Sequence, residues 1–504
     1  MTHEMDRRTA LRSIGALGLC PGLLSTRRPR APKPARTTSD GRVVDLVLEG
    51  ASTWLEGPDG GMSVVHGTYV RIEGSHIVDV RPGPIGGGDR VDLSGHLLVP
   101  GLISGHTHVA GASPTRGLIE GGRSFARPLE IVENMLDDDE LDALTTFNLA
   151  ELVRSGCTGQ VEMSLSLRQA RSYARVAERL GARGWVGGMI PGIGRLFPVW
   201  FGSDADLEAS EADTLAEIAA NLAFARSLRG GSGRVQGMIT PHAADTHTDR
   251  TLAAIAAAAT ELGTGIHTHL SQGARETETV RRRHGVTPTQ WLHRHGLFDG
   301  PFFGAHFTAP DWDLDPPILR EAGAVYSTCP SAGGAGGGTQ PFPEALAAGL
   351  AVNVGIDTHS NDMIENLKLA VLYGQARAAL LASVPGAQPV RSPTMADALA
   401  GSTRIAADAL RRPDLGRIEV GAAADLVAVD LRGFLVGSGA PPPEPLNNLL
   451  YANGLSVSTV LIDGRVHVMG GNFVADDAER IVEGGGRVAR RVWDALREEG
   501  FFDD

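Results

Sequence analysis

The feature that most restricts the fold of this chain is a long alternation of short apolar segments and alanine-rich segments between residues 101 and 405. The apolar segments are candidate strands, and eight of them occur, at 101–108, 157–164, 183–190, 235–242, 263–271, 302–307, 323–330 and 351–358. The stretches between them carry the apolar spacing that is typical of helices. Eight strands alternating with helices predict an α/β fold of the (β/α)8 TIM-barrel type. A doubly wound open sheet is the alternative, although no glycine-rich phosphate-binding turn follows the first strand.

Strand-like runs flank this region on both sides. Alternating apolar residues broken by glycine and proline fill 41–100, and a similar pattern returns in 406–475. We expect the two blocks to form one small β-sandwich domain built from N- and C-terminal segments. The predicted organisation is a leader (1–40), the N-terminal block of the sandwich (41–100), the barrel (101–405), the C-terminal block of the sandwich (406–475) and a C-terminal helix (476–504).

The first 40 residues read as a targeting segment. The run DRRTALR (6–12) resembles a twin-arginine export signal and is followed by a weakly apolar run. That run is too short to span a bilayer. We therefore expect an exported protein, periplasmic or extracellular, with a cytoplasmic location as the alternative if the signal is not functional.

Composition restricts the class of partner. The formal net charge of −13 argues against nucleic acid or an anionic membrane as the main partner. Cys20, Cys157 and Cys329 are the three cysteines, too few for a disulfide scaffold and not spaced as a zinc ribbon. A small-molecule substrate is the expectation that remains.

Metal-capable side chains stand at the ends of five of the eight candidate strands. They are His106, His108, His242, His267, His269, His306 and Asp357. In a TIM barrel these strand ends meet at one face, where barrel enzymes place their chemistry. His106 and His108 alternate with Thr107, so they point the same way, about 7 Å apart, and two such imidazoles suit a divalent metal. A lone buried histidine is usually structural, but this convergence predicts a metal site.

The motifs around these residues resemble those of the amidohydrolase superfamily, in the branch of guanine deaminase, S-adenosylhomocysteine deaminase and the triazine hydrolases. The similarity covers nearly the whole chain after residue 40. The supporting stretches are VPGLISGHTHVAGASPTRGL, ITPHAADTHT, GIHTHLSQ, GAHF, CPSAGG, VNVGIDTHSND and GRIEVGAAADLVAVD. The resemblance implies a barrel with a small sandwich domain, and it makes a homodimer an expectation.

The resemblance also implies a ligand set for one divalent metal. The ligands would be His106, His108, His269 and Asp357. Three imidazoles and one carboxylate leave a coordination position open for water and lower the pKa of that water. Asp357 would also take the proton as the water attacks. Zinc is the expected metal, with iron as the alternative, because imidazole suits both.

The number of metals follows from the lysines. Binuclear relatives bridge their metals with a carbamylated lysine or a glutamate from the barrel. The only lysines here are Lys33 in the leader and Lys368 in the helix after Asp357, so neither can bridge. The fourth strand offers His242 instead. One metal is the prediction.

Further residues are candidates around the metal. By the resemblance, His306 would orient the attacking water and His242 would contact substrate. His359 follows Asp357 and is a candidate for the pocket lining, although turn chemistry explains it equally well. Arg116 is a candidate substrate contact on the first loop, with a salt-bridge role as the alternative. These residues complete the predicted site.

Three more positions favour supporting roles. His267 shares a face with His269 one layer deeper in the barrel, and a hydrogen-bonded buried histidine is the favoured interpretation. Glu162 ends the second strand and is a candidate for holding a metal-binding histidine. Cys329 needs no catalytic role, because a buried cysteine is common in protein cores.

One position departs from the family pattern. Members of this branch carry His-x-x-Glu after the fifth strand, where the glutamate shuttles protons, but here the motif ends in Gln272. Glutamine has no titratable proton near neutral pH and can only form hydrogen bonds. Aromatic deamination without ring protonation is difficult, so Gln272 argues against a purine-type deaminase. Glu276 and Glu278 follow, and we expect them on the next helix, facing elsewhere.

Three functional hypotheses remain. The first is a mononuclear metal-dependent hydrolase that cleaves a C–N or C–O bond in an amide, carbamate, lactam or heterocycle substituent, with proton transfers at His306 and Asp357. The second is a heteroaromatic amine deaminase in which Gln272 only orients the substrate. The third is a catalytically weak, metal-retaining binding protein.

Overall fold

The computed structural model describes residues 36–38, 41–57, 61–433, 435, 437 and 442–503, which all belong to one compact unit, Pro34–Asp504. The twin-arginine motif and the rest of the leader apart from residues 36–38 lie outside the described residues. No helix among the described residues has the length and apolar character needed to cross a bilayer.

A ring of parallel strands forms the middle of the chain. In order these strands are β6 (Leu102–Thr107), β7 (Cys157–Ser164), β8 (Arg183–Ile190), β9 (Val235–Gly237), β10 (Thr240–Pro241), β11 (Ile266–Leu270), β12 (Phe302–His306), β13 (Val325–Thr328) and β14 (Ala351–Val354). Hydrogen bonds join β6 through β10 in one sheet and β11 through β14 in another. Parallel bridges from Thr107 to Asp357 and from Ile239 to Ile266 connect the two sheets at both seams. The predicted α/β fold of the TIM-barrel type is therefore confirmed, with β9 and β10 sharing the fourth position.

Helices follow each barrel strand. The longer ones are α3 (Asp138–Arg154), α4 (Leu167–Leu180), α7 (Glu211–Ser227), α8 (Asp249–Leu262), α9 (Ala274–His284) and α14 (Met363–Ala382). The shorter ones are α1 (Ala112–Thr115), α2 (Ala126–Met135), α5 (Ile193–Phe201), α6 (Asp204–Ala209), α10 (Pro288–Arg294), α11 (Asp315–Glu321), α12 (Pro330–Ala335), α13 (Phe342–Ala347), α15 (Met395–Ala400) and α16 (Ala406–Ala409). Local chemistry sets their ends. Ser166 caps α4 by accepting a hydrogen bond from the Gln169 N–H, and Gly181 ends it with a φ of 78° that suits glycine.

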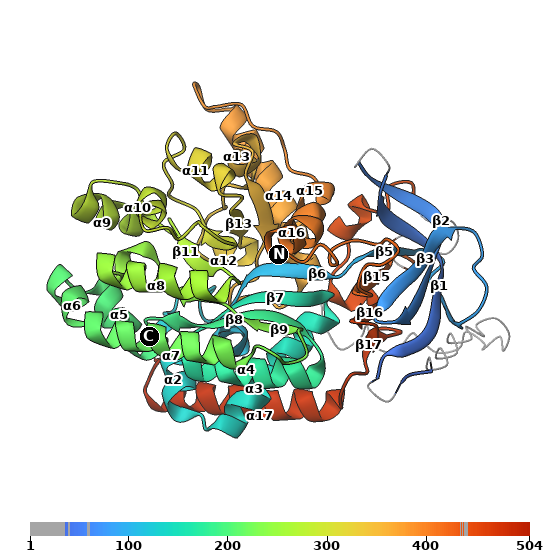
Figure 1. Cartoon of the computed structure of the whole chain (residues 1–504), viewed down its shortest axis with the longest axis horizontal. Helices are drawn as coiled ribbons and strands as arrows, with labels where there is room; N and C mark the ends of the chain where they lie inside the picture. The colour runs from blue at the N-terminus through green and yellow to red at the C-terminus, as the bar shows by residue number, and fades with distance from the viewer. Residues whose placement is uncertain are drawn as a thin grey trace, which may run out of the picture. The chain divides into compact units, whose positions relative to one another are not determined.

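Strands from both ends of the chain form a third sheet, separate from the two of the barrel. Its members are β1 (Val43–Glu56), β2 (Met62–Gly74), β3 (His76–Pro82), β4 (Asp89–Asp92), β5 (His96–Pro100), β15 (Leu426–Asp430), β16 (Val457–Ile462), β17 (Arg465–Met469) and β18 (Asn472–Phe473). The two blocks meet where β5 pairs antiparallel with β15, and the blue and red strands lie together in Figure 1. One sheet built from both ends of the chain is thus observed, while its description as a sandwich domain stays a prediction.

A buried ion pair joins the sheet of the two chain ends to the barrel, and the last helix packs on the barrel helices. Arg183, at the start of β8, makes two hydrogen bonds to Asp425, just before β15, at 2.7 and 2.9 Å. Both side chains are buried, at 5% and 4% exposure. The last helix, α17 (Ala478–Glu498), buries Val488, Val492 and Leu496 in a cluster with residues of α2 and α3. The predicted domain boundaries themselves stay predictions.

Candidate active site

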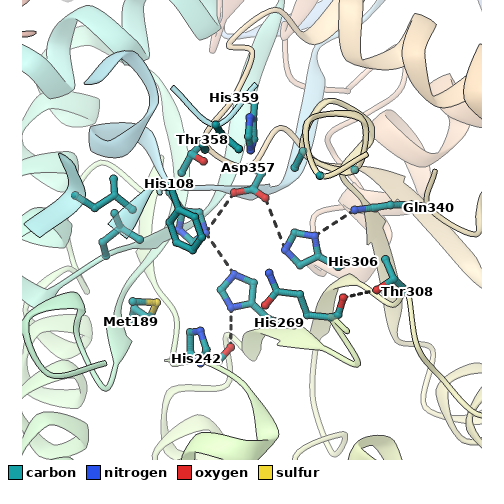
Figure 2. A pocket seen from close by; sticks show the side chains of 18 of the residues that line it. His108, Met189, His242, His269, His306, Thr308, Gln340, Asp357, Thr358 and His359 are labelled. Atoms are coloured by element: carbon teal, nitrogen blue, oxygen red, sulfur yellow. Dashed lines mark hydrogen bonds and ion pairs between the residues drawn. The ribbon is translucent and has the colours of Figure 1, made fainter. Parts of the chain in front are cut away.

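The carboxyl ends of the barrel strands enclose one cavity of about 500 Å³. Figure 2 shows His108, His242, His269, His306 and Asp357 around its floor. These five residues come from five different strand ends or the turns that follow them, and all five line the cavity. The convergence expected from a barrel therefore brings the predicted site residues together.

Three of the four predicted metal ligands, His106, His108 and His269, have ring nitrogens within 4.8 Å of one another, and Asp357 adjoins two of them. The Nε2 atoms of His108 and His269 are 3.3 Å apart. The Asp357 Oδ1 lies 3.7 Å from the His108 Nε2 and 4.0 Å from the His106 Nε2. Ligands about 2.1 Å from a tetrahedral zinc are about 3.4 Å apart, so these separations match one metal. The buried His106 Nε2 also has no hydrogen-bond partner among the described residues, which fits a metal ligand. The donor set fits a divalent ion.

Each imidazole is held through its other nitrogen. The His108 Nδ1–H donates to the Met163 carbonyl at 2.5 Å, and the His269 Nδ1–H donates to the His242 carbonyl at 2.9 Å. The His106 Nδ1 shares a hydrogen bond of 2.8 Å with the His267 Nε2. These contacts leave each Nε2 directed at the centre and set the tautomer, as metal-binding histidines require. His267 thus supports His106 from one layer deeper.

Burial keeps the histidines of the floor neutral. It lowers the pKa of His108, His242 and His269 below the ordinary value. It also lowers the pKa of His306 to about 4, against the opposing effect of Asp357. Unprotonated imidazole is the form that binds metals or accepts protons, so the site is prepared for a cation.

His306 and Asp357 face each other across the floor. The His306 Nε2 lies 3.7 Å from the Asp357 Oδ2, and the Gln340 side-chain amide is 3.2 Å from the His306 Nδ1. Both residues adopt left-handed backbone, with φ of 77° at His306 and 63° at Asp357. Non-glycine residues in this region are strained and occur often at functional sites. Gln340 was not predicted as a site residue, because it lies in a loop after a glycine run and no sequence motif marks it.

The predicted substrate contacts divide into two groups. His242 lines the cavity with its ring 4.8 Å from that of Trp200, and His359 lines the opposite rim with its Nδ1 3.2 Å from the Glu120 carboxylate. Arg116 does not line this cavity. Its guanidinium pairs with Glu151 and donates to the His359 carbonyl. The substrate-binding role of Arg116 stays a prediction, and this placement favours the salt-bridge alternative.

Gln272 lines the cavity, and a carboxyl group lies directly behind it. The backbone N–H of Gln272 donates to the Glu276 Oε2 at 2.7 Å, and Glu276 is 4% exposed. Burial, with Asp245 nearby, raises the pKa of the Glu276 carboxyl. Glu276 lies on α9, the next helix, and is absent from the cavity lining, as expected. Its carboxyl turns back to the backbone of the loop after β11.

Glu162 supports the site in a way that the sequence did not indicate. Its carboxylate accepts hydrogen bonds from the hydroxyls of Thr107 at 2.6 Å and Ser164 at 2.7 Å and from the Val109 N–H at 3.2 Å. It contacts no histidine through these bonds, so it holds the backbone turn around the His106–His108 pair instead. Burial raises the pKa of Glu162 to about 7.

Cys329 lies closer to the metal-binding residues than expected. Its buried Sγ is within 4.8 Å of ligand atoms of His106, His306 and Asp357. Burial raises the pKa of the Cys329 thiol above its ordinary value, so the neutral thiol packs behind the site.

The family of the chain follows from comparison with known proteins. A model of the amidohydrolase family matches residues 97–467, which include the barrel and every residue of the floor. The chain belongs to the amidohydrolase family. The resemblance found in the strand-end motifs is thus confirmed, and with it the prediction of a metal-dependent hydrolase.

Individual amidohydrolase relatives support the same branch. A 5-methylthioadenosine/S-adenosylhomocysteine deaminase from Pelotomaculum thermopropionicum is 28% identical over 459 residues, which cover 87% of this chain and 97% of the relative. An adenosine deaminase from Xanthomonas campestris with bound zinc superposes with a TM-score of 0.72 at 23% identity, covering 92% and 100% of the two chains. An atrazine chlorohydrolase from Arthrobacter aurescens complexed with zinc has a TM-score of 0.74 at 22% identity, covering 88% and 100%. The last two similarities establish the shared fold.

Proposed function

We propose that this protein is a mononuclear metal-dependent hydrolase that cleaves a C–N or C–O bond in an amide, carbamate, lactam or heterocycle substituent. The observation that carries the proposal is the group of His106, His108 and His269, whose ring nitrogens lie within 4.8 Å of one another. The Asp357 Oδ1 adjoins this group, 3.7 Å from the His108 Nε2 and 4.0 Å from the His106 Nε2. Among the described residues that line the cavity there is no lysine or glutamate to bridge a second metal. Zinc is the proposed ion, because imidazole and carboxylate are its usual ligands and two proteins of the same fold bind it.

The residues of this chain divide the work at the floor. His106, His108, His269 and Asp357 would hold the ion, which when bound lowers the pKa of water and polarises the scissile group. Asp357 has a second oxygen directed at His306. The pair is therefore positioned to accept a proton from the attacking water and to return it to the leaving group.

Gln272 decides which leaving groups are accessible. Its amide can orient a substrate atom but cannot deliver a proton. An amide, carbamate or lactam nitrogen, or an activated substituent, needs less acid assistance than the amino group of an aromatic ring. Hydrolysis of this kind therefore matches the acid–base groups that reach the cavity.

A heteroaromatic amine deaminase is the second candidate. The activity named for the Pelotomaculum relative supports it, because that protein aligns along 97% of its own length. In this case His306 and Asp357 would relay all protons and Gln272 would only hold the ring. A third hypothesis, a catalytically weak metal-retaining binding protein, is excluded by turnover of any substrate.

The experiment combines metal analysis with a substrate panel. We expect about one zinc per chain in the wild type, and loss of both metal and turnover in His108→Ala and Asp357→Asn. His295→Ala is the matched control, because His295 pairs with Asp249 away from the cavity. Ammonia release from amino-heterocycles would favour the deaminase, and cleavage of amides or carbamates the first proposal. Full metal content and full turnover in Asp357→Asn would refute the assigned site.

We also propose the finer architecture and the location predicted from the sequence. A shared apolar core of β1, β2, β3, β5 and β15 residues supports a sheet folded into a sandwich, because one cluster buries side chains from all of these strands. The twin-arginine motif supports export, and a homodimer remains the proposed assembly.

A further inference from the structure

One wall of the cavity is continuously apolar. It is formed by side chains from α2, α5 and the ends of β7 and β8. Its members are Leu129, Leu165, Met189, Ile193, Leu196 and Trp200. These residues also form a hydrophobic cluster of their own, separate from the barrel core, with Met163 and Phe197. The wall is therefore packed in a fixed shape before any ligand enters.

Apart from the proposed metal ion at its floor, the cavity offers no cation to an anionic ligand. Among the described lining residues none is arginine or lysine, and Asp357 is the one carboxylate. Two arginines around the cavity have partners already. Arg116 pairs with Glu151, and Arg275 pairs with the buried Asp245 at 3.4 Å. An anionic group placed in this cavity away from the metal would lose its hydration without gaining a counter-ion.

A row of aromatic rings leads from the apolar wall to the surface. The Trp200 ring lies 4.7 Å from that of Phe201, which stacks at 6.0 Å on Phe197, and Phe197 lies 6.5 Å from Phe125. Phe201 is 60% exposed and Phe125 39% exposed. The Arg275 guanidinium lies 4.8 Å from the Phe201 ring centre. This cation–π contact is a second interaction of Arg275 besides its pairing with Asp245. The aromatic rings therefore form an apolar path along which a ligand can reach the wall from the surface.

From these features we propose that the substrate is an uncharged small molecule with an aromatic or branched aliphatic group that packs on the α2–α5 wall, and that carboxylate- or phosphate-bearing molecules are excluded. The inference rests on the proposed function, since it assumes that the reacting carbon sits over the histidine floor. The apolar group then lies against Leu196 and Trp200, while the Gln272 amide and the Thr308 hydroxyl remain for neutral polar atoms. The volume of about 500 Å³ suits a molecule of one or two rings.

Hydroxamic acids test the inference without knowledge of the reaction, because the hydroxamate anchors to a divalent metal. The zinc-loaded protein is titrated calorimetrically with acetohydroxamic acid, benzohydroxamic acid and its 4-butyl and 4-carboxy derivatives. We expect the butyl derivative to bind about tenfold more tightly than benzohydroxamic acid, because the wall would bury about two of its methylene groups. We expect the carboxy derivative to bind about 100-fold more weakly than benzohydroxamic acid, because it buries one charge without a partner.

The outcomes separate this inference from the proposed function. If acetohydroxamic acid fails to bind, the metal centre is refuted and the inference falls with it. If acetohydroxamic acid binds but the carboxy derivative equals or exceeds the butyl derivative, the inference is overturned and the metal centre stands. The predicted order of the four compounds supports both.

A charge-insertion variant tests the missing cation directly. Ile119 lines the cavity and is half-buried, so an arginine there can reach a ligand without disturbing the packed wall. Ile119→Arg is expected to tighten binding of the carboxy derivative about tenfold more than it tightens binding of acetohydroxamic acid. Val420→Arg is the control, because Val420 is 65% exposed and outside the cavity lining. Equal effects of both variants on the carboxy derivative would overturn the inference.

Discussion

The buried carboxyl of Glu162 predicts a specific dependence of the unfolding free energy on pH. Its carboxyl is fully buried below the His106–His108 turn, and burial raises its pKa from the ordinary value of 4.5 to about 7. Below pH 4.5 the group is neutral in both the folded and unfolded chains, so its contribution to stability is fully present. As the pH rises from 4.5 to 7 the unfolded chain loses the proton first, and the folded state is progressively destabilised.

The size of this effect follows from the shift. Each pKa unit corresponds to about 1.4 kcal/mol, so a shift from 4.5 to about 7 removes about 3 kcal/mol of unfolding free energy between these pH values. Glu162→Gln abolishes the titration. Its amide oxygen can accept from Thr107 and Val109, and its NH2 can donate to the Ser164 hydroxyl. The variant therefore gains about 3 kcal/mol relative to the wild type as the pH rises from 4.5 to 8.

Urea unfolding followed by tryptophan fluorescence measures this difference. The metal-free protein is used, because a nearby dication would itself stabilise the carboxylate. Glu208→Gln, a change of the same chemistry at an exposed position on α6, is the control and should run parallel to the wild type. A difference between Glu162→Gln and wild type that stays constant to within about 0.5 kcal/mol over this pH range would refute the assignment of a raised pKa.

Three further predictions concern the cavity, the domain contact and the leader. Gln272→Glu places a titratable group at the cavity, so we expect a changed pH profile of kcat/KM and a gain of ammonia release from amino-heterocycles; an unchanged profile would count against a central role for this position. Arg183→Met leaves the Asp425 carboxylate buried without its partner, and we expect a loss of about 3–5 kcal/mol in urea unfolding, whereas a loss below about 1 kcal/mol would contradict the pairing. Arg7→Lys together with Arg8→Lys should retain the protein in the cytoplasm, as fractionation would show, and normal export of this variant would exclude the twin-arginine route.

The candidate metal site was accessible from the sequence because of the symmetry of the barrel, whereas the choice of four ligands within it came from the family resemblance. His106, His108, His269 and Asp357 each stand at the carboxyl end of a strand, and closing the barrel brings all such ends to one face whatever the loops do. The period of two along a strand also placed His106 and His108 on one side and His267 one layer below His269. Local patterns therefore determined the family, the fold and the candidate floor of the site.

Tertiary structure alone decided what surrounds that floor. Gln340 on His306 and Glu162 under Thr107 are contacts between segments whose spacing carries no periodic signal. The pairing of Arg116 with Glu151 likewise depends on where a loop and a helix meet. The apolar wall is the clearest case, because α2 and α5 belong to loops after different strands and become one surface only when the barrel closes. Strand ends follow from chain periodicity, whereas loop contacts follow from packing, and it is the loops that set which substrate this hydrolase accepts.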